Sequence, residues 1–228
     1  MSGPHDGQPL LHAGTPLADA TTAVVLVHGR GDSARGILGL VPEIERPGVA
    51  FLAPQAAGGA WYPTSFLAPL EANEPYLSSA IEAVLRAVGE AEAAGLDRQR
   101  VVLGGFSQGA CLATEVAARH AGRWGGVFAL SGGLLGTGPG PADAPRLPGM
   151  GGSYAEKAFD YDGDFVGTPV FLGCSDVDPH IPLARVEATA AVFARLGAAV
   201  DARVYPGMGH TVNQDEVGAV REMLGFGV

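Results

Sequence analysis

Short apolar segments alternate with longer amphipathic segments along most of this chain. The short segments are rich in β-branched residues and stop at glycine or proline, as buried strands do. The longer segments repeat apolar residues at helical spacing. This alternation predicts an α/β fold, with a mostly parallel central sheet and helices on both of its faces. The predicted strands are Ala23–His28, Val49–Ala53, Val101–Phe106, Gly126–Ser131, Pro169–Gly173 and Val200–Tyr205, and Leu10–Ala13 is expected to add an antiparallel edge strand. The predicted helices are Glu74–Ala94, Gln108–His120, Pro182–Leu196 and Asp215–Leu224.

The length of the chain, 228 residues, suits one domain with a large buried core. We therefore expect a single α/β domain over residues 1–228, which begins with an irregular segment over residues 1–22. Residues 132–168 form a Gly/Pro-rich excursion without a clear period. Such a long loop in a compact domain is usually functional or disordered, so it is either a flap over the site or an inert excursion.

Composition excludes several classes of partner. The formal net charge of −10 argues against nucleic acid or an anionic membrane. Cys111 and Cys174 are too few for a disulfide framework, and we expect two reduced, buried thiols. The first 22 residues lack the pattern of a signal peptide, and no apolar run is long enough to span a membrane, so a cytoplasmic location is expected by default. Whether the chain forms a homodimer stays open.

Residues 105–109 read Gly-Phe-Ser-Gln-Gly and match the pattern G-x-S-x-G. The motif follows a predicted strand and opens an Ala-rich helix, the setting in which it forms a tight turn that exposes the serine hydroxyl. The glycines at positions 105 and 109 leave room for that turn. We therefore predict Ser107 as a nucleophile, and the backbone N–H of Gln108 as one oxyanion donor. An ordinary glycine turn with a capping serine is the alternative.

A nucleophilic serine needs a base. The chain has six histidines, and their positions in the sequence indicate which of them is the candidate base. In this kind of fold the chain order is nucleophile, acid, histidine. His210 follows the last predicted strand in a glycine-containing loop, just before the last helix. We predict His210 as the base, against the alternative that it is a capping or loop histidine.

The triad acid should follow the fifth predicted strand, where Asp176 and Asp178 are both candidates. Counting residues from the end of the strand favours Asp176. Pro179 and Pro182 fix the backbone after Asp178, which favours Asp178 as the carboxylate that orients the histidine. A turn or cap role is the alternative for either residue.

The first predicted strand ends in His28-Gly29-Arg30-Gly31, where small residues let backbone N–H groups approach a developing oxyanion. A simple glycine turn is the alternative. Trp61 and Tyr62 follow the second strand at the same edge of the sheet. With Gly29 they are candidate substrate-binding residues, although Trp61 could equally pack only its own loop.

The segments GFSQGA, HGRGD, DPHIP and GMGH together resemble the phospholipase/carboxylesterase family of α/β-hydrolases, which includes acyl-protein thioesterases. The resemblance spans Val24 to Leu224. It implies hydrolysis of short to medium acyl esters by a triad of Ser107, Asp178 and His210. It also implies oxyanion donors at Arg30 and Gln108, although an apolar residue is common at the position of Arg30.

These observations predict a serine carboxylesterase that acts on a small-molecule ester. Alternatives are a thioesterase or lysophospholipase of the same family, or a binding or sensor protein on an inactive scaffold. No metal or other cofactor is predicted, because no Cys/His cluster occurs and the acidic segment from Asp160 lacks the spacing of a calcium loop. We expect a preference for acyl chains of about two to six carbons, because no helical lid is predicted and the charge of Arg30 would narrow and wet the pocket.

Overall fold

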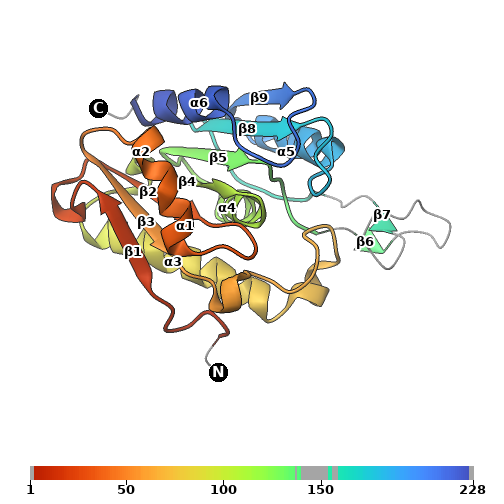
Figure 1. Ribbon diagram of the computed structural model, residues 1–228, viewed down its shortest axis with the longest axis horizontal. Coiled ribbons are helices and arrows are strands. Elements are labelled where there is room, and N and C mark those ends of the chain that lie inside the picture. Colours follow the sequence, from red (N-terminus) through yellow and green to blue (C-terminus); the bar gives the residue numbers. More distant parts are fainter. Residues whose placement is uncertain (1–2, 137, 140–153, 156–158, 226–228) are drawn as a thin grey trace.

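The computed structural model describes residues 3–136, 138–139, 154–155 and 159–225. Its main feature is a seven-stranded sheet with the strand order β1-β3-β2-β4-β5-β8-β9 (Figure 1). These strands are β1 (Leu10–Gly14), β2 (Thr22–Val27), β3 (Val49–Pro54), β4 (Val101–Phe106), β5 (Gly126–Leu130), β8 (Pro169–Ser175) and β9 (Ala199–Tyr205). Two short strands, β6 (Gly138–Pro139) and β7 (Tyr154–Ala155), pair separately.

The sheet is parallel except at one edge, where β1 pairs antiparallel with β3. Strands β2 to β5 are almost wholly buried, which explains their continuous apolar sequences. The edge strand β9 has only exposed and half-buried residues. The α/β fold with its antiparallel edge strand is therefore confirmed.

Helices cover both faces of the sheet and enclose two apolar cores. One face packs against α3 (Tyr76–Ala93), α4 (Gln108–Arg119) and α5 (Leu183–Arg195). The other face packs against α1 (Ala34–Ile37), α2 (Val41–Ile44) and α6 (Gln214–Gly225). The sequence did not predict α1 and α2, because a single helical turn is too short to show a period.

The chain leaves β2 toward β3 on one side, whereas β4 lies on the other side of β2. The loops after β2 and β4 consequently diverge, and a crevice forms outside the carboxyl ends of these strands. The loops after β8 and β9 end at the same edge because those strands are parallel to β4 and β5. The topology thus gathers the segments that carry the predicted site residues.

About half of the excursion over residues 132–168, namely residues 137, 140–153 and 156–158, lies outside the described residues, so its interpretation as a flap stays a prediction. Its described beginning is buried from Gly132 to Gly136, and Phe165 near its end is buried as well. Among the helices that the structure describes, none is both long and apolar enough to cross a membrane.

Candidate active site

Ser107 occupies the turn between β4 and α4. Its backbone has φ 56° and ψ −123°, in a region that non-glycine residues rarely adopt. Such a conformation costs on the order of 1–3 kcal/mol and persists only where the surroundings enforce it. A side chain on Gly105 or Gly109 would overlap the carbonyl oxygen of Val27 on the neighbouring strand. The two glycines therefore allow β2 and β4 to close around the turn.

Ser107, His210 and Asp178 form a hydrogen-bonded chain. His210 Nε2 lies 2.9 Å from Ser107 Oγ, and His210 Nδ1 lies 2.7 Å from Asp178 Oδ2. Because a carboxylate accepts the Nδ1 proton, Nε2 is left to accept the serine proton. The structure therefore brings together the three residues that the sequence predicted as a triad.

The Asp178 carboxylate is fully buried and has three hydrogen-bond donors. Besides His210, the backbone N–H groups of His180 and Ile181 donate to Asp178 Oδ1 over 2.8 Å and 3.0 Å. Donors on both oxygens stabilise the charged form of a buried carboxylate. The proline-flanked turn after Asp178 supplies these donors, so it fixes the carboxylate that faces the imidazole.

Asp176 faces a different partner. Its Oδ1 accepts the N–H of Gly207 over 2.8 Å, and Ser175 Oγ accepts the N–H of Gly209 over 3.1 Å. Both glycines have a positive φ, 70° and 77°, in the loop that carries His210. Asp176 thus holds the backbone of the histidine loop and does not contact the imidazole.

Two rings enclose the His210 imidazole. The Phe106 ring lies 4.9 Å away, and the His180 ring makes an edge-on contact at 4.8 Å between centroids. These rings restrict the rotation of the imidazole about its side-chain bonds. The sequence associated neither residue with the base, because both contacts depend on tertiary structure.

The residues predicted as oxyanion donors lie beside the serine turn. Gly29 packs against Phe106 and Ser107 and brings the main chain of Arg30 to the site. The backbone N–H groups of Arg30 and Gln108 donate to no acceptor among the residues that the structure describes. Unpaired N–H groups next to a nucleophile are the arrangement that an oxyanion hole requires.

A cavity of about 630 Å³ opens over Ser107 and has a polar and an apolar part. Its lining includes Gly29, Arg30 and Tyr62, as predicted for substrate contact or the oxyanion hole, together with Ser107, Gln108 and His210. The remaining lining residues are Asp32, Pro63, Thr64, Ser65, Phe66, Phe106, Cys111, Pro179, His180 and Ile181. This volume fits a small ligand.

Residues 14–138 of the chain match the phospholipase/carboxylesterase family. A solved phospholipase/carboxylesterase from Dyadobacter fermentans is 37% identical, with a TM-score of 0.84 and 96% of each chain covered. The chain belongs to this family. The fold and the family predicted from the sequence are both confirmed.

Other similarities are weaker. Acyl-protein thioesterase 1 of Saccharomyces cerevisiae is 24% identical over 91% of this chain and 93% of its own length. Acyl-protein thioesterase 1 of Gibberella zeae is 29% identical over 57% of this chain, and the match spans about half, 49%, of that protein. The Bacillus cereus carboxylesterase, at 18% identity, a TM-score of 0.67 and coverage of 98% and 96%, shares the fold.

In this family member Trp61 does not line the cavity, which corrects its prediction as a substrate-binding residue. The indole is fully buried, and its Nε1 donates to the carbonyl of His28 over 2.8 Å. The ring packs between the imidazoles of His5 and His28, at 5.5 Å and 4.9 Å. Trp61 therefore supports the wall from behind, and its neighbour Tyr62 reaches the cavity.

His5 and His28 are neutral parts of this support. His5 Nε2 donates to the Trp61 carbonyl over 2.9 Å, and His5 Nδ1 accepts the Ala57 N–H over 3.0 Å. His28 has the opposite tautomer, because Nδ1 faces the Gly29 carbonyl and Nε2 accepts the Ala56 N–H. Burial lowers the pKa of both imidazoles. The sequence did not indicate the role of His5, since its partners lie more than fifty residues away.

The two cysteines are free and buried, as predicted. Cys111 lies one helical turn after Ser107 at the floor of the cavity. Burial raises the pKa of both thiols to about 12. Because the thiolate is the reactive form, both cysteines are poor nucleophiles near neutral pH.

Proposed function

We propose that this chain is a serine carboxylesterase that hydrolyses short to medium acyl esters through an acyl-enzyme. The observation that carries the proposal is the hydrogen-bonded sequence Ser107–His210–Asp178, with 2.9 Å and 2.7 Å between the bonded atoms. It stands at the mouth of a cavity beside two unpaired backbone N–H groups. Membership of a hydrolase family supports the same reaction.

In the acylation step His210 Nε2 takes the proton of Ser107 while Oγ bonds to the ester carbonyl carbon. The carbonyl π pair moves onto oxygen, where the N–H groups of Arg30 and Gln108 stabilise it. When the carbonyl re-forms, the bond to the alcohol oxygen breaks, and His210 returns its proton to the departing alkoxide. Asp178 remains ionised throughout and stabilises the imidazolium.

In the deacylation step water takes the place of the alcohol. His210 removes a proton from the water, whose oxygen bonds to the acyl carbon. The second tetrahedral intermediate uses the same two N–H donors and collapses with release of the carboxylic acid. Ser107 recovers its proton from His210, so the cycle consumes one ester and one water and requires no cofactor.

A fluorophosphonate probe tests the proposal, because it labels an activated serine covalently. Mass spectrometry should locate the label on Ser107, and labelling should disappear in Ser107→Ala. A folded wild-type protein that is neither labelled nor active on any p-nitrophenyl ester would instead support a binding or sensor role on this scaffold.

The second candidate is an acyl thioesterase with the same catalytic residues. The relatives named acyl-protein thioesterase 1 favour it. A matched series of oxygen esters and thioesters with the same acyl group separates the two, since only the leaving group differs. A kcat/KM at least about tenfold higher for the thioesters, about 1.4 kcal/mol in barrier, would shift the assignment.

A further inference from the structure

The carbonyl oxygen of Tyr62 joins both of the proposed oxyanion donors. It accepts a hydrogen bond from Gln108 Nε2 over 2.9 Å and another from Arg30 Nη2 over 2.8 Å. Gln108 Oε1 also accepts the N–H of Trp61 over 2.9 Å. Arg30 and Gln108, the two proposed oxyanion donors, therefore both bind the same part of the cavity wall through their side chains.

The Arg30 side chain binds three consecutive carbonyls of this wall. Besides Tyr62, it donates to Pro63 over 3.1 Å and to Thr64 over 2.6 Å. A planar guanidinium presents several donors in a fixed fork, so it can bind all three at once. The expectation that the charge of Arg30 narrows and wets the pocket did not include these bonds, which tie the guanidinium to the wall.

Other hydrogen bonds also hold the main chain around Arg30. The Gly29 carbonyl shares a peptide unit with the Arg30 N–H. This carbonyl accepts from His28 Nδ1 over 2.8 Å and from the Asp32 N–H over 3.3 Å. Gly29 and Gly31 flank Arg30, and Gly31 adopts a φ of 78°. Glycine loses more conformational freedom on folding than other residues, so its neighbours are harder to hold in place. On the far side of the turn, the Gly31 N–H donates to the Gly59 carbonyl over 2.7 Å. The guanidinium supplies an anchor on the Arg30 residue itself.

We propose that Arg30 is a positioning residue, whose guanidinium fixes its own backbone N–H in the oxyanion hole by clamping it to the wall over residues 62–64. The inference rests on the proposed function. Because the clamp shares the Tyr62 carbonyl with Gln108, it couples the two halves of the hole. An apolar side chain at position 30 keeps the backbone N–H but removes the hydrogen bonds of the guanidinium. The N–H is then less well positioned, so the loss is in stabilisation of the transition state.

The test compares Arg30→Leu and Arg30→Lys with the wild type on p-nitrophenyl butyrate. We expect kcat to fall about 10- to 100-fold in Arg30→Leu, because small misplacements of catalytic groups have effects of this size. KM should change by less than about threefold, as expected for an interaction made mainly in the transition state. A trifluoromethyl ketone, which forms a tetrahedral adduct with the serine, should lose affinity in proportion to kcat/KM. Arg30→Lys keeps the charge without the fork and should recover only part of kcat.

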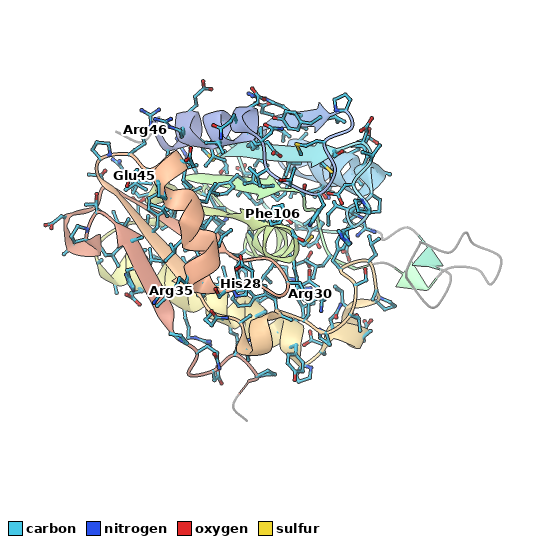
Figure 2. All side chains as sticks on the ribbon, in the orientation of Figure 1. His28, Arg30, Arg35, Glu45, Arg46 and Phe106 are labelled. Carbon is cyan, nitrogen blue, oxygen red and sulfur yellow. The ribbon has the colours of Figure 1, made fainter. Side chains whose placement is uncertain are left out.

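Arg46→Leu is the matched control. The Arg46 guanidinium also binds a backbone carbonyl, that of Arg221, over 3.2 Å. Figure 2 shows Arg46 far from His28, Arg30 and Phe106, which lie near one another. This control removes the same charge and should leave kcat unchanged.

A double-mutant cycle tests the shared carbonyl. Gln108→Ala keeps the backbone N–H of residue 108. The double variant should lose less kcat than the two single variants combined, because both side chains bind the Tyr62 carbonyl. Full additivity, a rise in KM alone, or an effect equal to that of Arg46→Leu would overturn the inference. If Arg30→Leu is unstable by thermal unfolding, Arg30→Gln and Arg30→Lys provide the same comparison. A wild type without labelling at Ser107 refutes the proposed function, whereas a labelled, active wild type with an unaffected Arg30→Leu refutes only this inference.

Discussion

Replacing Asp178 by Asn should be far more damaging than replacing Asp176 by Asn. At Asp178 the carboxylate accepts the Nδ1 proton of His210 over 2.7 Å. The two backbone donors on Asp178 Oδ1 will hold the oxygen of an Asn amide in the same place. The amide nitrogen then faces His210 and donates to Nδ1, which moves the imidazole proton to Nε2. His210 can then no longer accept the proton of Ser107.

The equivalent change in a serine protease lowers kcat about 10⁴-fold, which is about 5.4 kcal/mol at 1.36 kcal/mol per factor of ten. Asp176→Asn keeps an oxygen that can accept the Gly207 N–H, so only the charge on that bond is lost. We expect a loss of about tenfold or less, near 1.4 kcal/mol, from a residue that supports the loop.

The assay is kcat for p-nitrophenyl butyrate at neutral pH, with thermal unfolding of both variants as the control for folding. Comparable unfolding temperatures would show that the losses arise at the site. The reasoning is wrong if Asp176→Asn is the more damaging variant, or if Asp178→Asn loses less than about tenfold in kcat.

Three further predictions concern the nucleophile, the substrate and the wall. Ser107→Ala should lower kcat by about a millionfold with the fold intact; a folded variant that keeps a tenth of the activity contradicts this. On a p-nitrophenyl series, kcat/KM should be highest at about two to six acyl carbons, because the cavity of about 630 Å³ is lined by the buried side chains of Cys111 and Tyr62 and by the charged Arg30; a higher value for a twelve-carbon ester than for butyrate argues against it. Because burial lowers the pKa of His5 and His28 in the folded protein, unfolding binds protons, and stability should fall as the pH drops below about 6.5. Unfolding temperatures measured from pH 7.5 to pH 5 should decline less steeply in His5→Asn than in the wild type, and parallel curves would exclude a contribution of His5.

The central strands were predictable because they lie in the part of the sheet that is covered on both faces. Burial of both faces leaves a continuous apolar sequence that is readable without knowing its neighbours. The turn at Ser107 was also predictable, because a side chain at either of its two glycines would cause a steric overlap. The role of Ser107 itself stays a prediction, as do those of Asp178 and His210.

Contacts between distant segments were not predictable. One residue separates Asp176 from Asp178, and a count along the chain cannot say which of them meets His210. The burial of Trp61 depends on His5 and His28, which come from two other parts of the chain. Likewise, no local pattern says that the side chains of Arg30 and Gln108 converge on one carbonyl.

Most of the hydrogen bonds from Arg30 and Asn73 to the cavity wall end on backbone atoms of the wall; the exception joins Thr64 Oγ1 to Asn73 Oδ1. Arg30 binds the carbonyls of Tyr62, Pro63 and Thr64, and Asn73 binds the N–H of Thr64 and the carbonyl of Ser65. Every amino acid carries the same backbone carbonyl, so the hydrogen bonds that Arg30 and Asn73 make to these carbonyls are kept when most side chains of the wall are replaced. The wall can thus acquire new substrate preferences by mutation while the path of its backbone is fixed by residues outside it, which makes residues 62–65 a suitable segment for directed evolution of this hydrolase-family scaffold.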